Sequence, residues 1–471
     1  HPAMAEVKYA HQNIGFEAID LANGLFRVTN RFYFTNLKKY MVHYSVTANN
    51  KVVRSGKVSL DIEPQASKEF TVPVGNLKPQ AGTEYFVNFN VTTVEKEPLI
   101  PIGHEIACDQ FRLPIESPKK AFKTSGPKLT VSTNGDNLSA SSSKVNFVFN
   151  RKTGIVTSYK VDGTEYFSEG FGIQPNFWRA PTDNDYGNGM PKRLQVWKES
   201  SKNFNVTDAT VTMDGNNAVV NVNYLLPAGN LYIVNYTIYP SGAVNVAARF
   251  TSTDMDAAQT EVSEATRTAT FTPGRDAARK EASKLNVPRI GVRFRLPASM
   301  NQVEYFGRGP AENYLDRNAG SMIGLYKSTA EELYFPYVRP QENGHHTDTR
   351  WVSLSTGKKG LLIQADNTIG FNALRNSIED FDDEEATGLP RQWSNFTPEQ
   401  VANHDEAAAK SVLRRQHHIN DITPRDFVEV CVDLKQQGVA GYDSWGSRPE
   451  PAYTLPANRE YNWGFTLIPL K

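Results

Sequence analysis

The sequence predicts an all-β protein in which a small sandwich precedes a large two-sheet sandwich. Three observations carry this prediction. Apolar and polar residues alternate with period 2 along many short segments. The chain holds 25 Phe, 20 Tyr and 6 Trp residues, which favour strands. Its 32 Gly and 27 Pro residues fall between these segments, where they mark turns.

Residues 14–115 are predicted to form short strands of a small sandwich. Alternation is clearest over residues 40–46 and 85–91, where inward and outward side chains exchange at every position. Turns recur every 8–12 residues, a spacing typical of such sandwiches. Further strands are predicted at residues 24–34, 51–58 and 70–74.

A proline-rich segment separates the two predicted sandwiches. Residues 116–127 contain Pro118 and the run Ser125-Gly126-Pro127, and proline interrupts both helices and sheet ladders. We therefore expect a linker here, followed by the second domain over residues 128–471.

Residues 128–471 contain a long series of predicted strands and few helices. Hairpin signals lie at Asp162-Gly163, at Asp214-Gly215-Asn216 and at Pro240-Ser241-Gly242. A helix is predicted at residues 397–410, where Thr397 is a good N-cap followed by proline. Residues 277–285 are interpreted either as a second short helix or as part of an inserted loop.

Composition excludes several classes of function. Lys and Arg (51) balance Asp and Glu (51), so neither a nucleic acid nor an anionic membrane is expected as a partner. The distant Cys108 and Cys431 suggest neither a disulfide framework nor a zinc site. No run of 18 apolar residues occurs, so we expect a soluble chain. No signal peptide is visible, but a fragment need not contain one, so a cytoplasmic and a periplasmic location both stay open. The opening His1-Pro2-Ala3-Met4 suggests a fragment of a longer protein.

The richest polar cluster spans residues 176–189 and includes Arg179, Asp183 and Asp185. Its aromatic rings and planar polar groups suit sugar binding, because sugar faces stack on rings while hydroxyls pair with Asp, Asn and Arg. A structural loop in which Arg179 pairs with Asp183 or Asp185 is the alternative. A calcium loop is a third possibility, although Leu194 stands where an EF-hand needs Glu.

Two further clusters contain no recognised catalytic motif. Residues 305–317 place glycines around Arg308 but lack the ending of a phosphate loop, so a structural network of Arg, Asp and Glu is the alternative. Residues 336–351 bring His345 and His346 near Glu342, which could form an acid–base pair or simply line a polar surface. Adjacent histidines on a strand face opposite ways, so neither this pair nor His417-His418 is expected to bind a metal.

The fourth cluster, residues 438–446, places Trp445 on a loop rich in glycine. An exposed loop tryptophan provides a stacking surface for a sugar, and a structural role is the alternative. No pair of carboxylates can be assigned as the catalytic pair of a retaining glycosidase.

These clusters resemble the C-terminal region of the glycoside hydrolase family 2 β-galactosidases, the enterobacterial lactose-cleaving type. The resemblance covers nearly the whole chain, and its motifs fall in the family's order. They are His1-Pro2-Ala3 with Glu6 and Lys8, residues 60–65, residues 179–185, Gly307-Arg308-Gly309-Pro310 with Glu312-Asn313-Tyr314 and Asp316-Arg317, residues 337–344, and Asp443-Ser444-Trp445.

The resemblance implies that residues 1–115 correspond to the family's fourth domain, an immunoglobulin-like sandwich. It implies that residues 128–471 correspond to the fifth, a supersandwich related to galactose mutarotase. The family's catalytic glutamates and Mg ligands lie in a preceding (β/α)8 barrel, so neither catalytic nor metal-binding residues, and no cofactor, are expected in this chain. The intact family enzyme would use Mg and Na bound mainly outside this region.

One functional residue carries over from the family. The family's tryptophan at the position of Trp445 stacks on the substrate, and Asp443 belongs to the same motif. Tyr442 stands where the family often has a second Asp, which puts the loop's shape in doubt. The resemblance also places the Arg179–Asp185 loop near the barrel interface, where Arg179, Asp183 and Asp185 could contact sugar.

Three functions are therefore kept open. The first is an accessory region of a β-galactosidase that acts on terminal non-reducing β-D-galactose, as in lactose. Its expected partners are the preceding barrel of the same protein and, as a further option, other copies of the chain in a homo-oligomer. The second is a stand-alone carbohydrate-binding or mutarotase-like domain. The third is a purely structural module.

Overall fold

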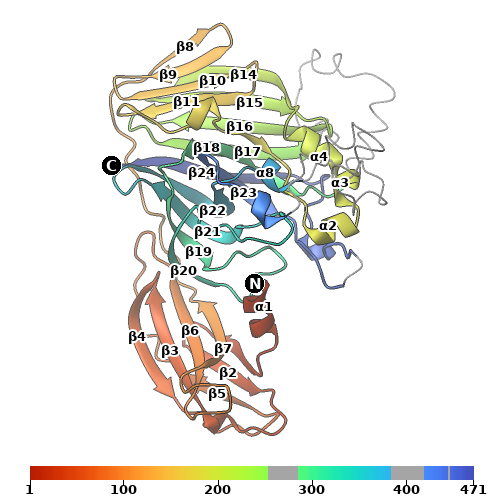
Figure 1. The fold of residues 1–471 in the computed structure, drawn as a ribbon. Coiled ribbons are helices and arrows are strands. Elements are labelled where there is room, and N and C mark those ends of the chain that lie inside the picture. Colours follow the sequence, from red (N-terminus) through yellow and green to blue (C-terminus); the bar gives the residue numbers. More distant parts are fainter. Residues whose placement is uncertain (253–284, 383–417, 444–445) are drawn as a thin grey trace, which may run out of the picture. The chain divides into compact units, whose positions relative to one another are not determined.

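The computed structural model describes residues 1–252, 285–382, 418–443 and 446–471 (Figure 1). Two compact units make up the chain. Unit 1 comprises residues 1–122, 306–313 and 317–326, and unit 2 comprises residues 123–305, 314–316 and 327–471. The helix predicted at residues 397–410 and most of the segment 277–285 lie outside the described residues. Within the described ranges, no helix is both long and apolar enough to cross a bilayer.

Unit 1 contains two antiparallel sheets. One has the order β1-β2-β5 and the other β4-β3-β6-β7. The bounds are β1 Ile14–Asp20, β2 Leu25–Asn30, β3 Tyr40–Ala48, β4 Lys51–Val58, β5 Ser67–Thr71, β6 Tyr85–Thr93 and β7 Glu105–Arg112, with helix α1 at Ala3–Ala10 and η1 at Leu37–Lys39. Every second residue of β6 is buried over most of its length, as the alternation predicts.

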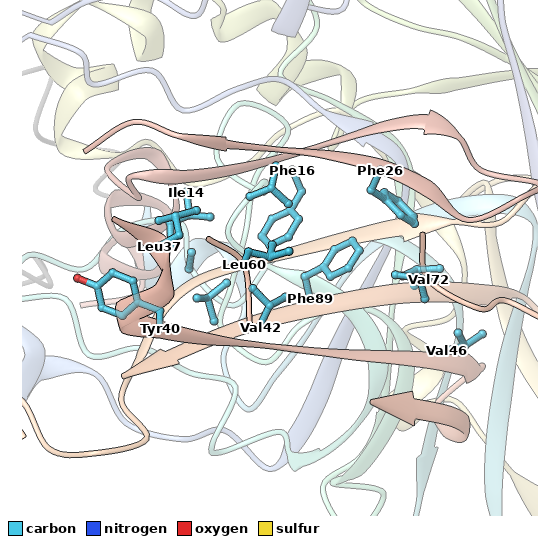
Figure 2. Packing of buried hydrophobic residues seen from close by; sticks show 14 of the residues in the cluster. Ile14, Phe16, Phe26, Leu37, Tyr40, Val42, Val46, Leu60, Val72 and Phe89 are labelled. Carbon is cyan, nitrogen blue, oxygen red and sulfur yellow. The ribbon is translucent and has the colours of Figure 1, made fainter. Parts of the chain in front are cut away.

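Aromatic rings fill the space between the two sheets of unit 1 (Figure 2). Phe16 of β1 stacks on Phe89 of β6 with ring centroids 4.3 Å apart. Phe26 of β2 meets Phe89 edge-on at 4.9 Å. Because Phe16 and Phe26 come from one sheet and Phe89 from the other, these contacts hold the sandwich together.

Strands β8 to β24 form a five-stranded sheet, β12-β11-β10-β9-β8, and a twelve-stranded sheet with the path β13-β18-β23-β22-β24-β17-β16-β15-β14 plus β19, β20 and β21. They belong to unit 2, except that residues 306–309 of β19 and 322–326 of β20 are assigned to unit 1. The bounds are β8 Thr130–Asn134, β9 Asn137–Ser141, β10 Val145–Asn150, β11 Ile155–Val161, β12 Thr164–Glu165, β13 Gln174–Asn176, β14 Asn205–Asp214, β15 Asn217–Leu225, β16 Asn230–Ile238, β17 Val244–Ser252, β18 Arg289–Pro297, β19 Gln302–Gly309, β20 Met322–Thr329, β21 His346–Ser355, β22 Gly360–Leu374, β23 Phe427–Gln436 and β24 Tyr461–Leu470.

The small sheet of unit 2 packs face to face on part of the large one (Figure 1). Phe147 and Phe149 of β10 lie 5.6 and 6.2 Å from the ring of Tyr236 of β16. The hydroxyl of Tyr159 in β11 donates to the carbonyl of Gly242 at 2.6 Å, which satisfies its polar end inside the core. The predicted all-β class, a small sandwich followed by a large supersandwich, is confirmed.

The helices of unit 2 that lie in the described ranges are short. They are α2 Asp183–Gly187, α3 Met190–Arg193, α4 Gln195–Ser200, α8 Ile378–Phe381, η2 Ser168–Gly170, η4 Ile419–Asp421 and η5 Pro451–Tyr453. Helix α2 lies inside the segment 176–189, which was predicted to be a loop. Thr182 and Asp185 form a capping box there, a helix-start signal that the sequence analysis overlooked.

Candidate functional site

Buried polar side chains gather around Glu342 in unit 2. Its Oε1 atom accepts three side-chain hydrogen bonds, from Arg289 Nη2 (3.0 Å), Asn372 Nδ2 (3.1 Å) and Gln436 Nε2 (2.9 Å). Its Oε2 atom accepts the backbone N–H of Ala180 at 3.2 Å. Both oxygens of this buried carboxylate are therefore occupied by protein donors. We call these side chains, together with His345 and Asp433, the Glu342 cluster.

Strand register brings most of the Glu342 cluster together. Strands β18, β23 and β22 are neighbours, and Arg289 of β18 pairs with Gln436 of β23 (Figure 1). Two residues further on, Gly291 pairs with Asp433. A Cβ at Gly291 would lie 2.1 Å from Asp433 Oδ1, so only glycine leaves room for this carboxyl group.

Charges in the Glu342 cluster compensate one another. Burial alone would lower the pKa of Arg289, but Asp433 and Glu342 outweigh it and raise that pKa above its usual value. Arg289 Nε lies 3.1 Å from Asp433 Oδ2, although the two are not aligned as a hydrogen bond. Burial raises the pKa of Asp433 to about 7. Arg289 is therefore always charged, whereas Asp433 titrates near neutral pH.

His345 is neutral in this environment. Burial, reinforced by the charge of Arg289, lowers its pKa to about 3. Its Nδ1 donates to Asn372 Oδ1 at 2.9 Å, so His345 and Glu342 share Asn372 as a partner. His346 faces elsewhere, and its ring lies 4.8 Å from that of Tyr305. The two histidines point in different directions, as the sequence predicts.

A small cavity adjoins the Glu342 cluster. Its lining combines polar groups with an apolar wall formed by Leu374, Ile378 and Phe381. It offers about 20 Å³ of space open to water, which suits one or two water molecules. This cavity is too small to hold a pyranose ring beside Glu342.

Arg179 and Asp185 form a second buried pair. Arg179 is fully buried and makes a bidentate contact with Asp185, whose Oδ1 lies 3.1 Å from Arg179 Nη2. Asp185 also accepts hydrogen bonds from the N–H and hydroxyl of Thr182 at 2.9 and 3.0 Å. Burial alone would lower the pKa of Arg179, but Asp185 raises it. The pairing named as the structural alternative is thus present, and it fixes the start of α2.

Asp183 is exposed on the same helix. Its carboxylate lies 3.4 Å from Arg339 Nη1 and accepts a hydrogen bond from Gln341 Nε2 at 3.2 Å. Arg339 lies over the ring of Tyr186, 3.9 Å from its centroid. The 176–189 and 336–351 clusters therefore meet at this surface.

Residues of two other clusters, 176–189 and 305–317, contact the segment 438–447. Asp316 accepts the backbone N–H groups of Val439 and Ala440 at 3.0 and 2.7 Å. Asn184 Nδ2 donates to the carbonyl oxygens of Val439 at 3.2 Å and Ser447 at 2.7 Å. We call residues 438–441 the first stem and residues 446–447 the second stem of this loop.

Two residues of this loop, Trp445 and Asp443, were predicted to bind sugar. Trp445 lies outside the described residues. Asp443 is exposed, and its Oδ1 accepts the backbone N–H of Ser447 at 3.1 Å. Tyr442 beside it is 68% exposed. The structure thus places Asp443 and Asp183 on the surface and buries Arg179 and Asp185.

Sequence reasoning did not single out four residues that organise this region: Arg289, Asn372, Asp433 and Gln436. Asn184 and Asp316 lie within two of the named clusters, but no role was assigned to them. A signal existed for Asp433, a charged residue in a mostly apolar stretch of β23, because a buried charge needs a partner. Arg289 begins β18, which also contains Arg293 and Arg295, so it does not stand out in the sequence. The contacts of Asn184 and Asp316 depend on tertiary structure, and local patterning contains no trace of them.

Comparison with protein families gives two matches. Residues 141–467 match the family described as the β-galactosidase small chain, and residues 26–114 match β-galactosidase domain 4. Among curated proteins, a β-galactosidase of Priestia megaterium is 30% identical over 473 residues, covering 100% of this chain and 40% of that protein. One from Streptococcus thermophilus is 25% identical, covering 100% and 39%. The chain therefore spans about 40% of the length of these relatives.

Solved structures give weaker likenesses. A putative aldose 1-epimerase from Escherichia coli aligns with a TM-score of 0.32 and 8% identity, over 73% of this chain and 99% of that one. A galactose mutarotase related enzyme from Lactobacillus acidophilus aligns with a TM-score of 0.35 and 10% identity, over 71% and 97%. Scores of this size carry no inference about activity.

Proposed function

The chain belongs to the β-galactosidase small-chain family, and from this premise we propose that it is the non-catalytic C-terminal region of a β-galactosidase. The intact enzyme would hydrolyse terminal non-reducing β-D-galactose residues. This region would support a catalytic barrel in the same protein and supply Trp445, which would stack on the galactoside.

The single observation behind this proposal is the family match along residues 141–467, in a chain that spans only about 40% of its relatives. The geometry of the carboxylates agrees with a non-catalytic role. Glu342 has both oxygens hydrogen-bonded, and Asp185 is buried against Arg179. A retaining glycosidase needs two carboxyl groups that face the sugar about 5–5.5 Å apart.

The chemical step is therefore assigned to other parts of the polypeptide. There, a retaining mechanism would use one carboxylate as nucleophile and another as acid and base. In this chain, the described ranges contain no group of three or more His, Cys, Asp or Glu side chains placed to hold a metal ion. We assign no metal-dependent step to its residues.

The role proposed for Trp445 is apolar contact with the sugar. An indole face covers the C–H face of a pyranose ring, and Asp443 in the same motif would offer a carboxylate to hydroxyl groups. The roles proposed for Arg179 and Asp185 are structural, because their charged atoms already pair with each other. Asp183, at the exposed start of α2, stays a proposed sugar or barrel contact.

A chromogenic β-galactoside tests the proposed division of labour. The 471-residue chain alone should release no chromophore, whereas the galactosidase polypeptide that contains it should. In that polypeptide, Trp445→Ala should raise KM by roughly 2- to 10-fold, the range expected for loss of one aromatic contact. Trp463→Phe, on strand β24, serves as the matched control and should leave KM unchanged.

Two outcomes would overturn the proposal. Galactoside turnover by the chain alone would mean that it holds its own catalytic groups. An unchanged KM for Trp445→Ala would remove the substrate-contacting role. Polarimetry with α-galactose separates the mutarotase-like alternative, because only that function would accelerate the change in rotation by the isolated chain.

A further inference from the structure

The first stem of the 438–447 loop is bound by one carboxylate. Asp316 accepts hydrogen bonds from two successive backbone N–H groups, those of Val439 and Ala440. The approach is close, because a Cβ at Gly438 would lie 2.4 Å from Asp316 Oδ2. Glycine at 438 is therefore required for the carboxylate to reach both amides. Such charge-assisted bonds are among the stronger hydrogen bonds in proteins.

One amide side chain joins the two stems. Asn184 Nδ2 donates both to the carbonyl of Val439 in the first stem and to the carbonyl of Ser447 in the second. Asn188 Nδ2 adds a bond to the same Ser447 carbonyl at 3.3 Å. The separation of the stems is therefore set by Asn184, which stands on α2 and not on the loop.

The stem backbone needs this support. Ala440 has φ of 54° and Gly441 has φ of 102°, and the left-handed region is unfavourable for alanine. The N–H of Gly441 donates to the hydroxyl of Ser447 at 3.2 Å, which again ties one stem to the other. Backbone strain of this kind persists only where surrounding contacts enforce it.

We infer that Asp316 and Asn184 are positioning residues that hold the two loop stems in a single arrangement and so determine how this loop meets a galactoside. The functional part of this inference rests on the proposed function of Trp445. Both residues would act through the loop backbone that they bind. Asp316 fixes the path of the first stem, and Asn184 fixes its distance from the second.

Amide hydrogen exchange tests the structural part in the galactosidase polypeptide that contains this chain. Asp316→Asn removes the charge that binds Val439 and Ala440, so exchange of these two amides should accelerate at least about tenfold. Asn184→Ala should accelerate exchange at Gly441 while Val439 and Ala440 stay protected by Asp316. Asn203→Ala, an exposed asparagine bonded to Glu199, is the matched control and should change neither.

General destabilisation would look different. It would accelerate exchange in β10 and β11 together with the stems and would shift the thermal unfolding curve. A uniform increase of that kind, or stem amides that do not respond to Asp316→Asn, would overturn the inference at the level of structure.

Kinetics with a chromogenic galactoside test the functional part. Asp316→Asn and Asn184→Ala should raise KM several-fold with a smaller change in kcat, and combining either with Trp445→Ala should add little to the effect of Trp445→Ala alone. A KM that stays unchanged although the stems exchange faster would overturn positioning. If Trp445→Ala itself has no effect, the proposed function fails instead, and the exchange data still decide whether the stems are held.

Discussion

The backbone of Gly446 lies directly against the backbone of Gly187. A Cβ built on Gly446 would lie 2.4 Å from the carbonyl carbon of Gly187 and 2.6 Å from the nitrogen of Asn188. Gly446 also has φ of 86°, a conformation that side chains disfavour. The second stem can therefore approach α2 this closely only because both positions are glycine.

Gly446→Ala should therefore lower the free energy of unfolding by more than the cost of placing an alanine at a positive φ. Gly441 is the matched control, because its φ is 102° but no atom lies within 4 Å of the added Cβ. Gly441→Ala should lower the free energy of unfolding by about 1–2 kcal/mol. Gly446→Ala should lower it by roughly a further 1–3 kcal/mol from overpacking. Urea unfolding measures both, and equal losses would contradict the backbone contact.

The buried pair of Arg179 and Asp185 gives a second prediction. Asp185→Asn would leave the guanidinium of Arg179 without its counter-charge in a fully buried site. The free energy of unfolding should fall by about 3–5 kcal/mol. Asp183→Asn, two residues earlier and paired with Arg339 at the surface, should cost at most about 1 kcal/mol. Similar losses in the two variants, measured by urea unfolding, would show that burial does not govern the pair.

Strand positions were predictable because alternation is a local property. Residues 40–46 and 85–91 lie within β3 and β6, and the hairpin signal Asp214-Gly215-Asn216 joins β14 to β15. Edge strands were harder to predict. Strand β5 begins at Ser67, three residues before the predicted segment. The prediction missed this start because four of the five residues of β5 are exposed and contribute little apolar signal.

Contacts between residues that are close in sequence were predictable in the candidate site, but contacts between distant segments were not. Arg179 with Asp185 was recognised as a possible ion pair because the two residues are close in sequence. The contacts of Asn184 with Val439 and Ser447 join residues more than 250 positions apart, and no local pattern encodes them. The assignment of residues 306–313 and 317–326 to unit 1 was likewise not among the predictions. Distant contacts of this kind are set by topology.

The core of unit 1 should depend strongly on Phe89. This ring is 2% exposed and contacts Phe16 and Phe26 across the sandwich. Phe89→Ala should therefore lower the free energy of unfolding by about 3–5 kcal/mol through lost burial and a new cavity. Phe34→Ala is the control, because that ring is 97% exposed and its removal should change stability by less than about 0.5 kcal/mol. A small effect of Phe89→Ala in urea unfolding would contradict the packing seen in Figure 2.

Asp433 and His345 should make stability depend on pH in opposite directions. The pKa of Asp433 is about 7 in the folded protein against 3.8 for an ordinary Asp, so between these values the folded state holds a proton that the unfolded chain has released. Its contribution to stability is therefore present below pH 3.8 and is lost as pH rises to about 7. His345, with a pKa of about 3 instead of 6.5, contributes stability above pH 6.5 that is lost as pH falls.

Asp433→Asn should isolate the first effect, because asparagine keeps the shape of the neutral acid at every pH and His345 is present in both proteins. At pH 4 the variant and the parent protein should unfold at similar urea concentrations. From pH 4 to pH 8 the free energy of unfolding of the variant should rise relative to that of the parent. The rise should be on the order of 4 kcal/mol at most, since each pKa unit of the shift corresponds to about 1.4 kcal/mol. A difference that stays constant over this range, or that changes in the parent's favour, would mean that Asp433 is ionised beside Arg289 throughout and that their ion pair outweighs the effect of burial.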